Sequence, residues 1–138
     1  MKEKALLVIT HGRFGIELVK SVEMIMGEQN NVVSMGLCLE DDVDELRINI
    51  KNEIEKFQKE GKEILLFVDV LGGSPSNIAL QMVNEYKVYM ITGVNMLMLI
   101  SFFSNCDSLE MEELVKNIVK TGSEGIKIFQ IGNFLGGK

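Results

Sequence analysis

The only histidine of this sequence, His11, is the residue best suited to nucleophilic chemistry. A neutral imidazole keeps a lone pair on one ring nitrogen, while its other nitrogen donates a hydrogen bond. A second polar residue, Asp69, lies near the end of a strongly apolar run, where a carboxylate is costly to bury unless it is paired. We therefore predict that Asp69 binds the Nδ1 proton of His11, which leaves Nε2 free to attack an electrophile.

A glycine-rich turn, Leu71-Gly72-Gly73-Ser74-Pro75, follows this aspartate and leads into a predicted helix. Glycines let backbone N–H groups approach an anion, and a helix N-terminus adds partial positive charge. A phosphoryl group is the electrophile that such donors suit, and two short segments are expected to supply them. The predicted phosphoryl-binding residues are Thr10, Gly12, Arg13, Gly72, Gly73 and Ser74, although Arg13 also fits a solvated side chain at a helix start.

The sequence contains none of the common signatures of bound nucleotides or metals. It has no Walker lysine motif, no dinucleotide fingerprint and no cluster with metal-ligand spacing. Its two cysteines, Cys38 and Cys106, have neither a zinc spacing nor the pattern of a disulfide framework. We expect no cofactor and no metal, and a phosphoryl group that is held transiently.

Short apolar runs alternate with amphipathic segments along the chain. Branched apolar residues in short runs predict buried parallel strands, and apolar residues at helical spacing predict helices. The expected strands are Ala5–Thr10, Val32–Cys38, Ile64–Val70, Lys87–Thr92 and Lys127–Ile131. The expected helices begin near Phe14, Val43, Pro75, Asn95 and Leu109.

This alternation predicts an α/β fold with a three-layer, doubly wound, mostly parallel sheet and helices on both faces. In such a sheet, chemistry collects beyond the carboxyl ends of the strands, where the strand order reverses. His11 follows the first strand, and Asp69 ends the most hydrophobic one. Loops that are distant in sequence should therefore converge on one crevice.

Length and charge limit the classes of protein to consider. With 138 residues, one proline and no Ser/Gly/Pro-rich stretch, the chain should form a single domain over residues 1–131, followed by a flexible tail, 132–138. The net charge of −6 argues against nucleic acid as a ligand and suits a basic protein partner. No apolar tract is long enough for membrane insertion, and no signal peptide is evident, so we expect a cytoplasmic protein.

Several segments together resemble one known family. They are Thr10-His11-Gly12, Val68-Asp69, Gly72-Gly73-Ser74-Pro75, Gly93-Val94-Asn95 and Thr121-Gly122. The sequence is similar, across most of its length, to the IIA domains of the mannose-family sugar phosphotransferase system. The resemblance implies a phosphotransferase with a phosphohistidine intermediate. The histidine-containing phosphocarrier protein would donate to His11, and His11 would donate to a IIB component. It also implies a homodimer in which the final strand, Lys127–Ile131, forms a sheet edge exchanged between protomers.

Two other functional classes fit some of the same residues. The fold and a phosphorylatable histidine would also serve the phosphodonor subunit of a dihydroxyacetone kinase or a regulatory IIA-like domain. A hydrolase with Ser74, His11 and Asp69 as nucleophile, base and orienting group is a weaker hypothesis. It is weaker because Gly72-Gly73-Ser74-Pro75-Ser76 lacks the Gly-x-Ser-x-Gly elbow.

Overall fold

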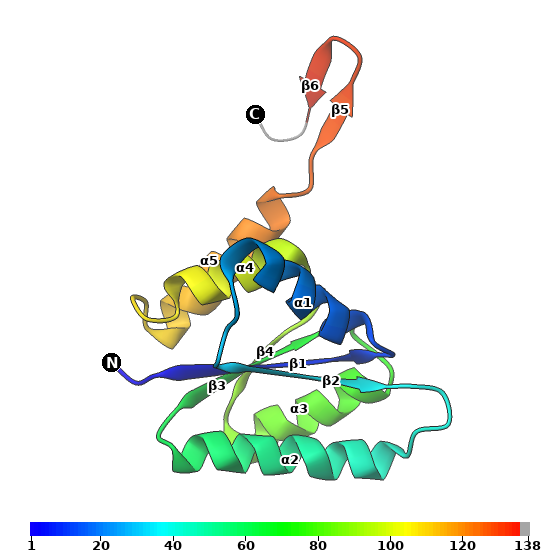
Figure 1. The fold of residues 1–138 in the computed structure, drawn as a ribbon, viewed down its shortest axis with the longest axis vertical. Helices are drawn as coiled ribbons and strands as arrows, with labels where there is room; N and C mark the ends of the chain where they lie inside the picture. Colours follow the sequence, from blue (N-terminus) through cyan, green and yellow to red (C-terminus); the bar gives the residue numbers. More distant parts are fainter. Residues whose placement is uncertain (136–138) are drawn as a thin grey trace.

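The computed structural model describes residues 1–135, in which one parallel sheet lies between two layers of helices (Figure 1). Its strands lie in the order β2-β1-β3-β4, and every pair is parallel. The strands are β1 (Lys4–His11), β2 (Val32–Leu37), β3 (Glu63–Val68) and β4 (Tyr89–Ile91). The helices are α1 (Phe14–Met26), α2 (Val43–Lys59), α3 (Ser74–Tyr86), α4 (Met96–Asn105) and α5 (Met111–Glu124). The predicted doubly wound α/β class is confirmed.

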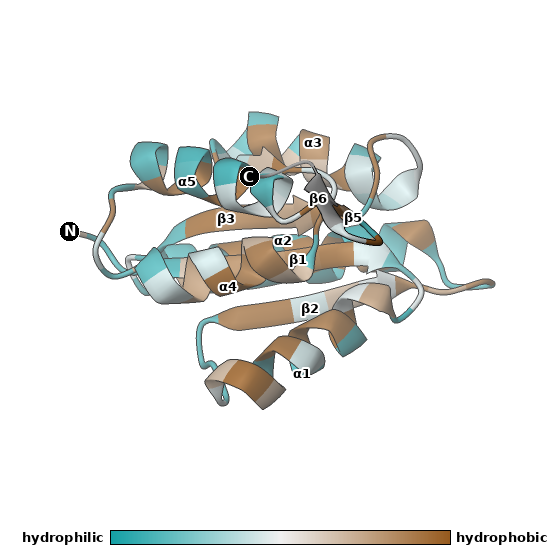
Figure 2. Cartoon of the chain, turned by 90° about the horizontal axis from the view of Figure 1, so that it is seen from above, coloured by the Kyte–Doolittle hydropathy of each residue, from teal (hydrophilic) through white to brown (hydrophobic). Residues whose placement is uncertain are grey.

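The central strands are buried on both faces, which explains their nearly continuous apolar sequence. Figure 2 shows β1, β2 and β3 coloured as predominantly hydrophobic ribbons. Because side chains alternate along a strand, Leu7 and Ile9 of β1 pack with α2 and α3, while Leu6 and Val8 pack with α1, α4 and α5. Each fully buried aliphatic side chain of this kind contributes about 1.5–3 kcal/mol to folding. The rigid sheet therefore fixes where the ends of β1 and β3 lie.

Most helix boundaries follow from local chemistry that the sequence displays. Asp42 caps α2, as its acidic cluster predicted, because its carboxylate accepts the N–H of Asp44 at 2.9 Å. Gly27 follows α1 with a φ of +89°, a conformation that favours glycine. The sequence predicts Pro75 as the first residue of α3, but the helix begins one residue earlier, at Ser74. Pro75 is therefore its second residue. Strand β4 is shorter than predicted because Lys87 ends α3 in a left-handed conformation.

The C-terminal region departs most from the prediction. The last predicted strand is present as β5 (Ile128–Gln130), but it is not part of the four-stranded sheet. It pairs antiparallel with β6 (Asn133–Leu135), and this hairpin projects beyond the layer of α4 and α5 (Figure 1). The predicted flexible tail from Gly132 thus contains a strand, because Gly132, with a φ of +73°, lets the chain reverse. The remainder of that tail, residues 136–138, lies outside the described residues.

No helix within residues 1–135 is long and apolar enough to cross a membrane.

Candidate functional site

The candidate site lies at the carboxyl edge of the sheet, between the ends of β1 and β3. His11 is the last residue of β1, and Asp69 follows directly after β3. These two strands are neighbours, with Ile9 opposite Val68, and the strand order reverses between them. The convergence predicted from the sequence is therefore present.

The imidazole of His11 is held by the carboxylate of Asp69. Nδ1 lies 2.9 Å from Oδ2, and the same oxygen accepts the backbone N–H of His11 at 2.8 Å. The other oxygen, Oδ1, accepts the backbone N–H of Val70 at 2.9 Å. Since a carboxylate only accepts, Nδ1 carries the proton and Nε2 keeps its lone pair. The His11 side chain is 52% exposed, against 13% for Asp69, so the imidazole is accessible while the carboxylate is mostly covered.

Asp69 stays ionised over the neutral pH range. Partial burial raises the pKa of its carboxyl, but hydrogen bonds from the backbone N–H and ring of His11, and from the N–H of Val70, outweigh burial and hold the pKa of Asp69 below its usual value. A carboxylate in this state favours positive charge on the adjacent ring. The site is thus suited to a reaction in which the imidazole becomes cationic.

The free nitrogen of His11 faces the glycine turn. A Cβ atom added at Gly73 would lie 3.1 Å from Nε2, closer than nine in ten real Cβ contacts. Gly73 also has a φ of +90° and is the N-cap of α3. Both features disfavour a side chain here, so glycine brings bare backbone close to Nε2 of His11.

The backbone N–H groups of Gly73 and Ser74 are available to an acceptor. Within residues 1–135, no hydrogen-bond partner occupies the N–H of either residue, and both lie in the first turn or cap of α3. The first N–H groups of a helix lack intrahelical acceptors, and the helix dipole adds positive potential there. A phosphoryl group attached to Nε2 would meet these donors.

Two predicted phosphoryl-binding side chains point elsewhere. Thr10 is fully buried, and its hydroxyl donates to the carbonyl of His11 and accepts the N–H of Gly15. It fastens the start of α1 to the end of β1. Arg13 forms an ion pair with Glu17 one helical turn later, with Nη2 and Oε2 2.9 Å apart. The structure therefore supports the other interpretation of Arg13, a solvated side chain at the start of a helix.

Two predicted backbone donors are also already engaged. The N–H of Gly12 donates to the carbonyl of Leu37 at 2.8 Å. The N–H of Gly72 donates to the hydroxyl of Ser76 at 2.8 Å. Neither group faces a ligand without first losing its partner, so these glycines shape the turns around His11 and do not supply donors.

Sequence reasoning missed three residues that shape the site. A Cβ at Gly36 in β2 would lie 1.8 Å from the carbonyl oxygen of Gly12, so only glycine lets the turn after His11 cross this strand. Gly93 donates its N–H to the carbonyl of Asp69 at 3.0 Å. Ser76 is the third. A glycine inside the predicted strand was the available signal for Gly36, since it often marks a close backbone approach.

Four large apolar side chains are exposed on segments at the same edge of the sheet as His11. Phe14 starts α1, Leu39 follows β2, and Val70 and Leu71 lie between β3 and α3. Their exposed fractions range from 50% for Phe14 to 95% for Leu39. Exposed apolar side chains on neighbouring loops are suited to contact with another protein. We call these four residues the apolar rim.

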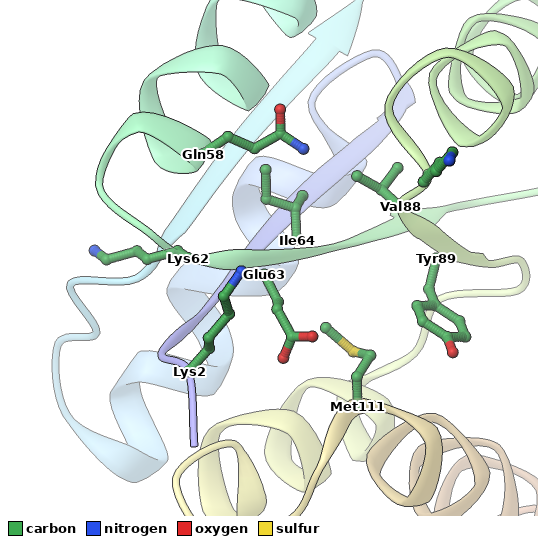
Figure 3. Close-up of a pocket in the computed structure, with 9 residues that line it drawn as sticks. Lys2, Gln58, Lys62, Glu63, Ile64, Val88, Tyr89 and Met111 are labelled. Carbon is green, nitrogen blue, oxygen red and sulfur yellow. The ribbon is translucent and has the colours of Figure 1, made fainter.

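A separate cavity of about 320 Å³ lies at the opposite, amino-terminal edge of the sheet (Figure 3). Its lining includes Lys2, Lys62, Glu63 and Tyr89, and it contains neither His11 nor Asp69. Among the described residues, no group of three His, Cys, Asp or Glu side chains has the arrangement of a metal site. No hydrogen bond within residues 1–135 joins the Ser74 hydroxyl to His11, which is the contact that a Ser-His-Asp hydrolase needs.

Comparison with known proteins places the chain in a family. The profile of the "PTS system fructose IIA component" family matches residues 5–119. The chain is 34% identical over 125 residues to the "PTS system mannose-specific EIIAB component" of Escherichia coli K12, a match that covers 89% of this chain and 38% of that relative. It is 26% identical to the "PTS system fructose-specific EIIA component" of Bacillus subtilis 168, with coverage of 90% and 85%.

The fold agrees with this match. The crystal structure of phosphotransferase system component EIIA from Streptococcus agalactiae superposes with a TM-score of 0.81 and 28% identity, and the match covers 88% of this chain and 94% of that one. The predicted resemblance is thereby confirmed. Since the family profile spans most of the chain and the fold is shared, this chain belongs to the fructose- and mannose-type family of IIA components of sugar phosphotransferase systems.

Proposed function

We propose that this chain accepts a phosphoryl group on Nε2 of His11 from the histidine-containing phosphocarrier protein and passes it to a IIB component. The proposal rests on the different surroundings of the two ring nitrogens of His11. Nδ1 is bound to Asp69 at 2.9 Å, while Nε2 is open and faces Gly73. A relay of this kind fits a cytoplasmic protein, as the family resemblance implies.

The chemistry balances without a cofactor. The lone pair of Nε2 attacks phosphorus as the donor's bond to phosphorus breaks, and Nδ1 keeps its proton. The ring gains positive charge, which the Asp69 carboxylate stabilises from 2.9 Å. Reversal of the same step on a second acceptor releases neutral His11 for another cycle.

The glycine turn would bind the oxygens of the phosphoryl group once it is on Nε2. Nε2 faces Gly73, and the N–H groups of Gly73 and Ser74 lie at the N-terminus of α3. These donors suit the phosphoryl oxygens, because backbone N–H groups at a helix N-terminus favour negative charge. We propose that Gly73 and Ser74 bind the phosphoryl group and that Thr10, Gly12 and Gly72 shape the site, while Arg13 is a solvated side chain paired with Glu17.

The surroundings of the site suit transfer between proteins. His11 is half exposed inside the apolar rim, so a partner that covers the rim would bring its own histidine to Nε2 and exclude water. The relatives' names, "EIIAB component" and "EIIA component", support a IIB partner downstream.

We extend the proposal to a homodimer that exchanges the C-terminal strand. Strand β4 is an edge of the sheet, and an apolar cavity lies on each of its faces. One, of about 640 Å³, includes Leu80 and Val83 of α3. The other, of about 480 Å³, includes Val115 and Val119 of α5. An unpaired edge between two apolar grooves suits one more strand with apolar side chains on both faces.

The segment 126–131 has that pattern. Ile126 and Ile128 alternate with Phe129 and Ile131, and all four are more than half exposed, from 60% for Ile128 to 103% for Ile131. We call this segment the C-terminal arm. Because the arm projects away from the sheet of its own chain (Figure 1), a second copy is the occupant that fits the grooves.

Incubation with phosphoenolpyruvate, enzyme I and the phosphocarrier protein tests the central step. We expect one acid-labile phosphate per chain by intact mass, and none in His11→Ala. Circular dichroism of the variant should match the wild type, because the His11 side chain is half exposed. Acid-labile phosphate in His11→Ala would overturn the proposal, as would a wild-type chain that stays unphosphorylated.

A further inference from the structure

We propose that Ser76 is a positioning residue for phosphoryl transfer, which locks the glycine turn against His11. The inference rests on the proposed function, since the turn matters only if Nε2 receives a phosphoryl group. Ser76 itself does not reach the reacting atoms. It acts through the backbone of Gly72, whose N–H its hydroxyl accepts at 2.8 Å.

The contact between Ser76 and Gly72 is partly buried. Ser76 is fully buried in the first turn of α3, whereas Gly72 and Gly73 lie on the surface. Ser76 is the third residue of α3, whose N-cap is Gly73. Its side chain reaches back to Gly72, the residue before that N-cap. This geometry resembles a capping box, in which the side chain at this position accepts a backbone N–H just outside the helix.

The glycine turn depends on this hydrogen bond because few other contacts restrain it. Gly72 and Gly73 have φ values of +100° and +90°, and glycine visits many other conformations at low cost. The preceding residues, Val70 and Leu71, are 55% and 70% exposed, so core packing does not hold them. At the near end, Asp69 binds the N–H of Val70, and at the far end Ser76 binds the N–H of Gly72. The turn is thus pinned by one side chain on each side.

The conformation of the turn matters because Gly73 lies next to Nε2 of His11. A Cβ at Gly73 would lie 3.1 Å from Nε2, so rotation of the Gly72–Gly73 peptide would move backbone into or away from the position of the phosphoryl group. It would also redirect the N–H groups of Gly73 and Ser74. Small misplacements of groups around a reacting atom reduce rates strongly.

Ser76→Ala removes the acceptor and keeps the helix, because alanine is a good helix former. Its matched control is Ser101→Ala, which removes another buried serine hydroxyl that is hydrogen-bonded to Asn117 in the helical layer on the other face of the sheet. The readout is the rate of transfer from the phosphorylated phosphocarrier to His11. We expect Ser76→Ala to lower kcat about 10-fold, with KM for the phosphocarrier unchanged because the apolar rim is intact. Ser101→Ala should change neither constant.

Amide hydrogen exchange in the wild-type protein provides a second measurement that does not depend on a variant. The Gly72 amide should exchange more slowly than the Gly73 amide, because only the former has an acceptor. Equal exchange of the two amides would overturn the inference, even if Ser76→Ala failed to fold.

The outcomes separate the inference from the proposed function. A phosphorylated wild type with wild-type kcat in Ser76→Ala would remove the role of Ser76 and leave the relay standing. Equal loss of kcat in Ser76→Ala and Ser101→Ala would reduce Ser76 to a general stability effect and also overturn the inference. Absence of phosphate on the wild-type chain would remove the relay and the inference together.

Discussion

The His11 site and the C-terminal arm differ in how much of their surroundings one chain supplies. At the site, Nδ1 of His11 and both oxygens of Asp69 have partners from the same chain. In the arm, Ile126, Ile128 and Ile131 are at least 60% exposed, and the edge of β4 offers apolar cavities on both faces. The first region has its polar partners within one chain, whereas we propose that the second is completed by another copy.

The difference separates the chemistry from the assembly. Parallel strands and short loops suffice to bring His11 and Asp69 together within one chain. In the proposed dimer, the arm gains its apolar burial from a second chain. Variants in one region should therefore leave the other region's property unchanged.

The largest effect within this comparison is expected from Asp69→Asn. An amide still accepts the backbone N–H of His11, but it does not stabilise a cationic imidazole as a carboxylate does. Transfer rates to and from His11 should fall about 100-fold, as for loss of one electrostatic group aimed at developing charge. Stopped-flow or rapid-quench transfer assays measure this directly, and sedimentation should show the dimer unchanged. Wild-type rates in both directions would argue against the role given to Asp69.

The next effect is expected in the arm, from Ile128→Asp. Ile128 is 60% exposed, so each chain would lose about 1 kcal/mol of apolar burial in the proposed dimer, and the two chains together about 2 kcal/mol, or about 30-fold in the dimer dissociation constant. Analytical ultracentrifugation over a concentration series measures it. The matched control is Met24→Asp, which changes an equally apolar side chain, 87% exposed, on α1. A monomeric wild type at tens of micromolar, or equal dissociation in both variants, would contradict the exchanged arm.

A smaller effect, specific to the site, is expected from Gly73→Ala. The added methyl group would meet Nε2 at 3.1 Å, so transfer should slow about 10-fold. Gly27→Ala is a close control, because Gly27 has a φ of +89° against +90° for Gly73 and no atom within 4 Å of an added Cβ. Both variants carry the same backbone strain, and only one crowds the nucleophile. Equal transfer rates in the two would mean that Gly73 does not face the reaction.

The smallest effect concerns stability at acid pH. Burial raises the pKa of Asp69, but hydrogen bonds from His11 and Val70 hold it below its usual value, so folding favours the ionised form. The resulting stabilisation is present above the unfolded pKa, about 4, and is lost as pH falls through the lower folded value. Urea unfolding should therefore show wild type and Asp69→Asn differing at pH 7 and converging near pH 3. A difference that grows as pH falls would contradict the direction of the pKa shift.

The sequence predicted the parts of the site that depend on the sheet and missed those that depend on local competition. His11 and Asp69 converge because carboxyl ends of neighbouring parallel strands must share an edge. Arg13 fits both a phosphoryl donor and a solvated side chain in the sequence, and its ion pair with Glu17, one turn later, favours the second. The N–H of Gly72 has an acceptor in Ser76, a local contact that the glycine pattern alone does not reveal.

The arm shows a further limit of prediction from one chain. Apolar residues over Lys127–Ile131 correctly predicted a strand, but a pattern does not say which sheet a strand joins. The family resemblance, and not the pattern, suggested exchange with a second copy. Ile126, Ile128 and Ile131 remain at least 60% exposed in one chain, which is the observation behind the proposed dimer.

Nitrogen-15 spectra of the phosphorylated protein test the central claim most directly. The two ring isomers of phosphohistidine give distinct signals, and the contact of 2.9 Å between Nδ1 and Asp69 leaves only Nε2 for the phosphoryl group. We predict phosphate on Nε2 and a proton on Nδ1. Phosphate on Nδ1 would mean that Asp69 does not orient His11, and it would contradict the mechanism proposed for this site.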